Sequence, residues 1–307
     1  MSAGDAGAAR AQRLRAIAMM MAGMITLPAM DAIAKYLALT YAITAAQTVF
    51  FRFSVQALVL GAVLLTIGGL AALRPRYLTV NLVRGAVMSI AVMMFFAALK
   101  HMPLADALAI FFTEPLILTV MSAVLLGERF GRWRLGAILL GFAGAMLIIR
   151  PGFADFGVVA LFPLVTATLF ALYLIITRKF APDDDPVAMQ FVSGLGGAAM
   201  IATVMPLGTM LGLDSFGTAP LPVTIFPWFL LLLIGLIAAG GHLIVVYAFQ
   251  RAPASLLAPF QYIEIISAVL LGWLVFADFP DGLTWLGIAI IVASGLTITW
   301  RESVRGD

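Results

Sequence analysis

The sequence lacks cysteine altogether and contains two histidines among its 307 residues. Without cysteine the chain has no disulfide framework, no thiolate nucleophile and no cysteine metal site. The histidines, His101 and His242, lie far apart and cannot supply the cluster of ligands that a metal-dependent membrane enzyme needs. Phosphate-binding motifs are also missing, so the sequence predicts a protein that is not an enzyme and that needs no metal or cofactor.

Charged residues are scarce as well, at 11% of the chain, whereas 63% are hydrophobic and the mean hydropathy is +1.10. These values lie far outside the range of soluble domains. The chain is therefore predicted to be an integral membrane protein, with the lipid bilayer as a partner. Its net charge of +3 does not indicate nucleic-acid binding, because the basic residues follow a pattern that marks membrane topology.

Ten apolar segments can be distinguished, at residues 14–38, 44–70, 80–99, 103–126, 132–149, 156–177, 187–211, 226–249, 254–276 and 282–300. Basic residues precede the first segment and then recur in every second gap: Arg10, Arg13 and Arg15; Arg74, Arg76 and Arg84; Arg129, Arg132 and Arg134; Arg178 and Lys179; Arg251; Arg301 and Arg305. Because cytoplasmic loops carry an excess of lysine and arginine, this alternation predicts ten transmembrane helices with both termini in the cytoplasm.

The N-terminal segment has an alternative interpretation as a cleavable signal peptide, since three arginines precede an apolar run that ends near Ala32 and Ala34. Cleavage would remove the first span and break the charge alternation. The run is also long for a signal peptide and is interrupted by Asp31. We therefore expect a membrane helix here.

The two halves of the sequence resemble each other weakly. A shift of 150 residues aligns Ala98 and Pro103 with Ala248 and Pro253, Glu114 with Glu264, and Glu128 with Asp278. If the units are residues 1–152 and 153–307, each holds five spans, and an odd number of spans forces the halves to insert in opposite orientations. The fold class predicted is thus an all-α integral membrane protein of two inverted five-helix repeats, a construction used by secondary transporters.

Several ionisable residues fall within the apolar segments: Asp31, Lys35, Arg52, Asp106, Glu114, His242 and Glu264. A charge at mid-bilayer costs at least a few kcal/mol, so such side chains are expected to face the bundle interior or a water-filled cavity. Asp31 and Lys35, four residues apart, either pair with each other or line that cavity. Arg52 lies too deep to snorkel reliably and either contacts the solute or ties helices together.

Other polar residues are expected to have structural roles. Arg84 and Asp106 lie near the ends of their segments and are predicted to be interfacial anchors. His242, beside Gly240 and Gly241, is predicted to be a packing residue rather than a proton carrier.

Glu114 and Glu264 are the main candidates for a transport site. Each follows, by about eleven residues, a proline that opens its segment, which places it near mid-bilayer at a rise of about 1.5 Å per residue. A carboxyl group in a low dielectric favours its neutral form, whereas a nearby cation favours the charged form, and a proton-coupled or cation-binding site uses that balance. Pro115 removes one backbone hydrogen bond and frees the carbonyl of Phe111, which predicts a broken helix at a cavity. Pro259 is expected to do the same in the ninth segment.

Aromatic residues cluster on the same segments, among them Phe51, Phe112 and Tyr262. Any one of them is expected to pack in the core or face lipid, but a cavity lined by several would favour a flat solute. Together with Gln261, they complete the candidate substrate-binding residues: Asp31, Lys35, Phe51, Arg52, Phe112, Glu114, Gln261, Tyr262 and Glu264. Closely spaced glycines and alanines indicate tight helix contacts within the chain or in a homodimer.

The block PLADALAIFFTEPLILTVMSAVLLGERFGRWRLGAILLGFAGAMLIIRPG, residues 103–152, resembles the repeat of the EamA-type transporters of the drug/metabolite transporter superfamily. It has an opening proline, a mid-span proline, a Leu-Gly-Glu-Arg sequence and a glycine-rich fifth span. The second copy, at 253–300, has Ala277-Asp278 where the family usually has Gly-Glu. The resemblance implies a multi-pass carrier of the bacterial inner membrane with two inverted repeats and a central cavity.

The segment APFQYIEIISAVLLGW, residues 258–273, is similar to family members that import riboflavin or S-adenosylmethionine. Riboflavin is neutral and flat and would use aromatic stacking with hydrogen bonds from groups such as Gln261 and Tyr262. S-adenosylmethionine would place its cations against Asp31, Glu114 or Glu264 and its carboxylate against Arg52. The aromatic residues favour riboflavin uptake, with an S-adenosylmethionine or amino-acid-like metabolite carrier or exporter as the alternative, and a non-transporting scaffold as another class.

Overall fold

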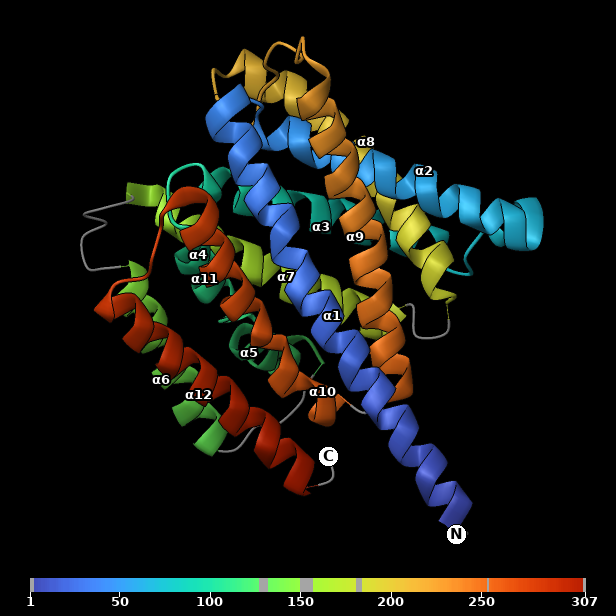
Figure 1. The fold of residues 1–307 in the computed structure, drawn as a ribbon, viewed down its shortest axis with the longest axis vertical. Helices are drawn as coiled ribbons and strands as arrows, with labels where there is room; N and C mark the ends of the chain where they lie inside the picture. The colour runs from blue at the N-terminus through green and yellow to red at the C-terminus, as the bar shows by residue number, and fades with distance from the viewer. Residues whose placement is uncertain (1–2, 127–131, 150–156, 181–183, 253, 306–307) are drawn as a thin grey trace.

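The computed structural model describes residues 3–126, 132–149, 157–180, 184–252 and 254–305. Across these ranges the regular structure is helical, without a strand. The helices are α1 (Ala3–Tyr41), α2 (Ala45–Ala72), α3 (Leu78–Leu99), α4 (Leu104–Phe111), α5 (Glu114–Leu126), α6 (Arg132–Ile149), α7 (Phe162–Phe180), α8 (Pro186–Met210), α9 (Ile225–Arg251), α10 (Ala254–Gln261), α11 (Ile263–Phe276) and α12 (Gly282–Arg305), with a 3₁₀ turn at Gly157–Leu161. Every apolar segment of the sequence is therefore a helix or a pair of short helices (Figure 1).

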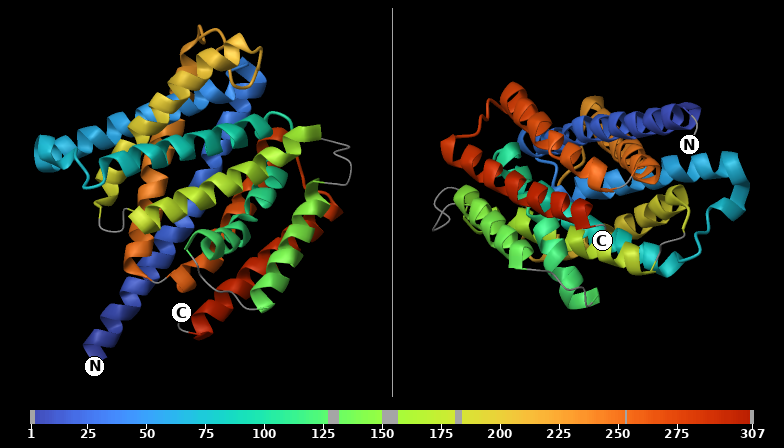
Figure 2. Two further views of the ribbon diagram at one scale, coloured as in Figure 1. Left: turned by 180° about the vertical axis from the view of Figure 1, so that it is seen from behind. Right: turned by 90° about the horizontal axis from the view of Figure 1, so that it is seen from below.

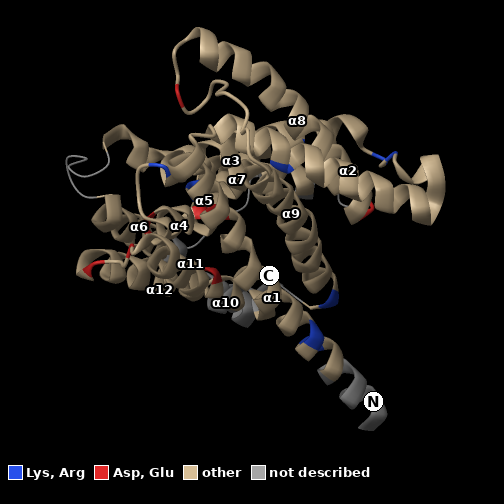
Figure 3. Ribbon diagram, turned by 45° about the horizontal axis from the view of Figure 1, so that its top comes forward, with Lys and Arg blue, Asp and Glu red and all other residues tan. Residues whose placement is uncertain are grey.

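Seven stretches of the described chain are long and apolar enough to cross a bilayer, which makes this a multi-pass membrane protein. These stretches are Ala11–Tyr41, Ala45–Ala72, Leu78–Leu99, Leu104–Leu125, Gly157–Thr177, Pro186–Met210 and Ile225–Arg251. Three further apolar helices are shorter, at Leu135–Ile149, Ile263–Phe276 and Gly282–Thr297. The outer faces carry leucine, isoleucine and valine side chains, and Figure 3 shows charged residues at only a few positions along the helices.

The packing of the first five segments against the last five is largely symmetric. The contact between α3 and α8 corresponds to that between α9 and α2. The contact between α1 and α9 corresponds to that between α7 and α3. In the same way, the contact between α1 and α11 corresponds to that between α7 and α5. Helices α2 and α8 pack on each other, as do α6 and α12, which lie side by side along one flank (Figures 1 and 2). The segments that correspond in this packing are five places apart along the chain.

The contact between α4 and α11 has no symmetric counterpart of similar extent among the described residues. Helix α4 packs on α11, but α10 and α5, which correspond to them, make no comparable contact within the described chain. The α4–α11 contact lies at the end of the bundle that holds the α1–α2 and α3–α4 turns. The end where α4 and α11 pack together is called the closed end here, and the opposite end is the one where α1 begins and α12 ends (Figure 1).

Side chains seal this closed end. Thr44 caps α2 with a capping box that includes Gln47, and its Oγ1 donates a hydrogen bond to the carbonyl of Gly217 at 2.8 Å. Nε2 of Gln47 donates to the carbonyl of Ala219 at 2.7 Å. These bonds hold the loop between α8 and α9 against the turn between α1 and α2. The largest cluster of buried apolar side chains, which includes Leu37, lies beneath.

Arg84 is not an interfacial anchor, contrary to the sequence-based prediction, because it is 1% exposed in the interior between α3, α7 and α8. Its Nε donates to Oγ1 of Thr177 at 2.7 Å, its Nη1 to Oδ1 of Asn81 at 2.6 Å and its Nη2 to the hydroxyl of Tyr173 at 2.8 Å. Nδ2 of Asn81 donates in turn to Asp184 at 2.7 Å. The guanidinium is thus satisfied by a polar network that sequence spacing does not reveal. Asp106, the other predicted anchor, is also buried, at 5% exposed.

Candidate solute-binding cavity

A cavity of about 340 Å³ lies between the two halves. This volume falls within the range of sites for small organic molecules. Its lining comes from helices α1 to α5 and α7 to α11, and no described residue of α6 or α12 belongs to it. Six of the candidate residues lie on its wall: Asp31, Arg52, Phe112, Glu114, Gln261 and Glu264.

Two broken helices form part of the wall. Helix α4 ends at Phe111 and α5 begins at Glu114, so the break predicted from Pro115 is present. The carbonyl of Thr113 accepts hydrogen bonds from the amides of Leu116 and Ile117 at 3.0 and 3.1 Å, which restarts the helix after the break.

The second break lies at Tyr262, between α10 and α11, and not at Pro259 as predicted. Pro259 stands inside α10, and the position that corresponds to Pro115 under the 150-residue shift is Ile265. The second half thus keeps the break without a proline at the corresponding position. The carbonyl of Tyr262 accepts the amide of Ile265 at 3.2 Å.

The residues at the two breaks meet in space. Phe112 and Tyr262 are 150 positions apart, and their ring centroids are 5.2 Å apart at an interplanar angle of 36°. Two residues further on, Glu114 and Glu264 both line the cavity. The repeat alignment therefore brings four corresponding residues to the centre of the molecule.

Arg52 is the principal cation of the cavity wall. It is 2% exposed, its Nε donates to Sδ of Met30 at 3.3 Å, and its guanidinium carbon lies 4.5 Å from the ring centroid of Phe53. Its Nη1 is buried and makes no hydrogen bond with any described residue. A buried guanidinium nitrogen without a partner is costly, so a ligand is expected to supply one.

One carboxyl group on the wall also has an unsatisfied oxygen. Oε1 of Glu114 is buried and makes no hydrogen bond with the described residues. Asp31 and Glu264 line the same cavity as Arg52, and no ion pair joins any two of these three described residues. The cavity therefore presents the acceptor Oε1 of Glu114 as well as the donor Nη1 of Arg52, and neither atom has a hydrogen-bond partner among the described residues.

Aromatic side chains form another part of the wall. Phe95 contacts Phe111 with ring centroids 6.0 Å apart, and Phe111 contacts Phe170 at 5.5 Å, both edge to face. Phe170 stacks on Tyr173 at 5.6 Å with an interplanar angle of 29°. With Phe112, these rings from α3, α4 and α7 make a surface suited to a flat ring system.

His242 lines the cavity, one of the two positions expected for an ionisable residue in an apolar segment, although its neighbouring glycines favour a packing role. Its Nδ1 lies 2.8 Å from the carbonyl oxygen of Ala238, one turn earlier in α9. The glycines beside it had suggested helix packing, and only the position of α9 against α1 and α2 shows that this face of α9 meets the cavity.

Three candidate residues do not line the cavity. Lys35 pairs with Asp278, its Nζ lying 2.5 Å from Oδ2, and donates to the carbonyl of Met102 at 3.2 Å, so it does not pair with Asp31. Phe51 packs edge to face on Trp228, with centroids 5.3 Å apart. Tyr262 lies behind Phe112, with its hydroxyl against Gly295.

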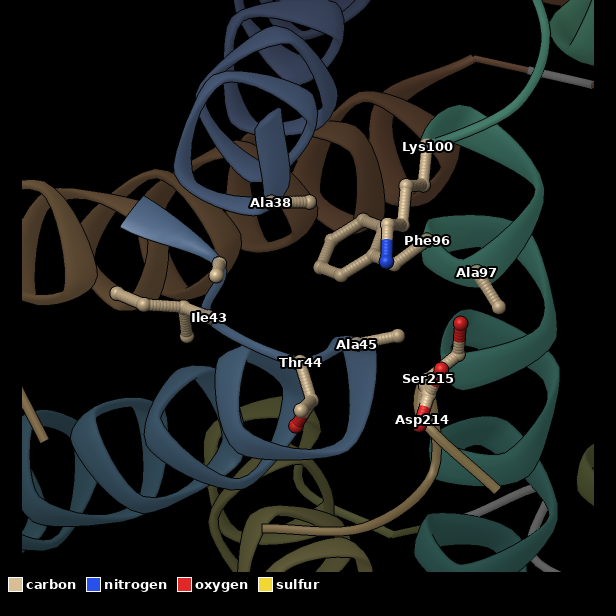
Figure 4. A pocket seen from close by; sticks show the side chains of 10 residues that line it. Ala38, Ile43, Thr44, Ala45, Phe96, Ala97, Lys100, Asp214 and Ser215 are labelled. Carbon is tan, nitrogen blue, oxygen red and sulfur yellow. The ribbon is translucent and has the colours of Figure 1, made fainter. Parts of the chain in front are cut away.

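A second, much smaller pocket of about 20 Å³ lies at the closed end. It is bounded by Ala38, the start of α2, Phe96 and Lys100 on the α3 side, and Asp214 (Figure 4). That volume suffices for about one water molecule, so this pocket is not a site for an organic solute. Among the described residues, no group of three or more histidine, aspartate and glutamate side chains could hold a metal ion.

Comparison with known proteins gives a family for the whole chain. The model of the EamA-like transporter family matches residues 14–150 and again 157–300. A solved crystal structure superposes with a TM-score of 0.60 at 20% identity and covers 98% of this chain and 99% of its own, which shows a common fold.

Individual relatives are carriers of different solutes. The chain is 29% identical to a riboflavin transporter of Vibrio cholerae, over 90% of this chain and 89% of the relative. It is 28% identical to a pseudopaline exporter of Pseudomonas aeruginosa, over 89% of this chain and 92% of the relative. It is 25% identical to an S-adenosylmethionine uptake transporter of Rickettsia felis, over 94% of each. The similarity thus indicates a small-molecule transporter and not an enzyme. The relatives carry different solutes, so similarity alone does not identify the solute of this chain.

Proposed function

Because the chain belongs to the EamA-like transporter family, we propose that it takes up riboflavin across the bacterial inner membrane by alternating access around the central cavity. The observation that carries the proposal is the composition of the cavity wall. Aromatic rings from three helices stand beside buried polar atoms that have no partner in the described protein. Riboflavin combines a flat ring system with carbonyl, N–H and hydroxyl groups, which meets both features.

Each wall residue has a role in this proposal. Phe112 stacks on the ring system, supported from behind by Tyr262. Nη1 of Arg52 donates a hydrogen bond to a ring carbonyl, because a guanidinium nitrogen is a donor only. Glu114, Glu264 and Asp31 accept from N–H or hydroxyl groups, and the amide of Gln261 both donates and accepts. Identity with three riboflavin transporters at 29% supports this assignment.

The topology that goes with this function has ten spans, with α4 and α5 forming one span and α10 and α11 another. We place both termini in the cytoplasm, as the basic residues indicate. Residues 1–152 and 153–307 then form two inverted repeats of five spans. The symmetric packing of segments five places apart supports this arrangement, and so do the positions of Glu114 and Glu264 on one cavity.

Alternating access requires that one end of the bundle close while the other opens. The α4–α11 contact closes the end that holds Lys35 and Asp278, and the described residues of α5 and α10 make no comparable contact. The cavity is lined by Met24 to Asp31 of α1 and His242 to Phe249 of α9, which run toward the less closed end. During transport the bundle alternates between an arrangement with the α4–α11 contact and one with an α5–α10 contact. The α5–α10 contact forms as the α4–α11 contact opens.

A second candidate solute is S-adenosylmethionine, favoured by the three carboxyl groups on the wall. In that case Asp31, Glu114 or Glu264 faces the sulfonium or ammonium group, and Arg52 faces the carboxylate. The aromatic wall argues for riboflavin first, since stacking accounts for more of the lining than the carboxyl groups do.

Uptake by cells tests the choice. A bacterial strain without its own riboflavin and S-adenosylmethionine carriers expresses this chain and is offered each labelled solute in parallel. We expect uptake of riboflavin that excess unlabelled riboflavin blocks. Uptake of S-adenosylmethionine alone would contradict riboflavin and support S-adenosylmethionine as the solute. Uptake of neither by cells that contain the inserted protein would contradict both import assignments.

A further inference from the structure

The imidazole ring of His242 is oriented by a contact with the backbone, and this contact determines which ring nitrogen can bind a solute. A backbone carbonyl can only accept a hydrogen bond, so the contact of 2.8 Å between Nδ1 and the carbonyl of Ala238 requires the proton on Nδ1. In the neutral imidazole, Nε2 then carries a lone pair and no proton. The ring lines the cavity, and no hydrogen bond joins Nε2 to a described residue.

The neighbours of His242 define what it can recognise. Arg52 lines the same cavity from α2, in the other half of the chain. The donor Nη1 of Arg52 has no partner among the described residues. A guanidinium donor and an imidazole acceptor thus face one cavity of about 340 Å³. This pair is complementary to a solute edge on which a carbonyl and an N–H are adjacent.

We propose that His242 is a specificity-determining residue whose Nε2 accepts a hydrogen bond from the imide N–H of the solute, while Arg52 donates to the adjacent carbonyl. This inference rests on the proposed function, since the ring system of riboflavin carries such an edge, with its imide nitrogen between two carbonyl groups. The carboxyl groups of Asp31, Glu114 and Glu264 remain for the hydroxyl groups of the side chain of riboflavin. Recognition of the edge draws on both halves, because α2 supplies Arg52 and α9 supplies His242.

The test compares riboflavin with its analogue methylated on the imide nitrogen, which keeps the ring system and both carbonyls but has no N–H to donate. Each compound competes with labelled riboflavin for uptake. In the wild-type protein the methylated analogue is expected to compete roughly tenfold less well, the order of magnitude for one lost hydrogen bond that leaves a buried acceptor unpaired. The variant His242→Phe removes the acceptor and keeps a flat ring, so the two compounds should compete about equally. His242→Gln retains a side-chain oxygen and should restore part of the preference.

The chain offers a matched control in its other histidine, since His101 lies between α3 and α4, outside the cavity lining. His101→Phe should keep the wild-type preference. Equal competition by both compounds in the wild-type protein, or an unchanged preference in His242→Phe, would overturn the role of His242 while leaving riboflavin uptake in place. Absence of riboflavin uptake by the inserted wild-type protein would instead overturn the proposed function. If His242→Phe does not insert, His242→Leu, which also lacks the acceptor, takes its place, and a wild-type preference that persists in it would overturn the role of His242.

Discussion

Lys35 on α1 and Asp278 after α11 form an ion pair at the closed end of the bundle, with Nζ 2.5 Å from Oδ2. Lys35 is 5% exposed, also donates to the carbonyl of Met102, and lies over the ring of Phe276. One side chain of the first half thus joins the α3–α4 turn to the end of α11 in the second half. In an alternating-access cycle this end must separate, so the pair must break on each cycle.

The first prediction concerns this ion pair. Asp278→Asn removes one charge and leaves Lys35 buried without its counter-ion, so the population in which this end is open should rise. The chain lacks cysteine, so a cysteine introduced by Ala38→Cys is the single site that a maleimide can label. Its rate of labelling measures how accessible this end is. We expect labelling of that cysteine by a membrane-impermeant maleimide to be several-fold faster with Asp278→Asn.

Asp278→Glu is the control for this measurement, because glutamate keeps the negative charge at the more exposed partner of the pair and should label at nearly the original rate. Equal labelling rates with aspartate and asparagine at position 278 would show that the ion pair does not hold this end closed.

The second prediction concerns the unpaired polar atoms of the cavity. Arg52→Ala and Glu114→Gln should insert normally and lower riboflavin uptake at least about tenfold, because each removes a hydrogen bond that the solute completes. Uptake is measured against the amount of inserted protein. Glu264→Gln should act in the same direction, since Glu264 corresponds to Glu114 and lines the same cavity. Full uptake by both Arg52→Ala and Glu114→Gln would remove these residues from the site.

The third prediction separates stacking from packing with two phenylalanines. Phe112 lines the cavity, whereas Phe51 packs on Trp228 outside it. Phe112→Leu should raise the KM for riboflavin roughly two- to tenfold, the range expected for one lost aromatic pair. Phe51→Leu makes the same chemical change at the other position and should leave KM unchanged. A larger effect at position 51 than at 112 would place the aromatic part of the site elsewhere.

The fourth prediction concerns stability. Arg84 donates hydrogen bonds to Asn81, Tyr173 and Thr177 in the interior. Because Arg84→Gln removes most of these bonds, it should lower the melting temperature of the detergent-solubilised protein by several degrees. Arg74 is exposed, and Arg74→Gln should leave the melting temperature unchanged. An Arg84→Gln protein as stable as the wild type would mean that the network contributes little to the fold.

Much of the fold could be predicted because the membrane imposes strong rules on a sequence. Length and apolarity locate the segments, and Pro115 breaks its helix for a local steric reason that the sequence states directly. The pairing of Glu114 with Glu264 followed from the repeat alignment.

The inward face of each segment could not be predicted in the same way. A membrane helix is apolar on the side that faces lipid and on the side that packs, so periodicity does not distinguish Phe112 from Phe51. Contacts between distant segments were also out of reach. Lys35 was expected to pair with Asp31 or to line the cavity, and its partner Asp278 lies 243 positions away. The burial of Arg84 and the cavity position of His242 depend on the same long-range packing.

Solute counterflow is the sharpest test of riboflavin transport through this cavity, because it needs only the purified protein in liposomes and depends on neither a coupling ion nor the direction of transport. Vesicles preloaded with unlabelled riboflavin are diluted into a trace of labelled riboflavin. We expect transient accumulation of label in vesicles with the wild-type protein and none in vesicles with Glu114→Gln. Folded wild-type protein that accumulates no label from riboflavin-loaded vesicles would contradict riboflavin transport through this cavity.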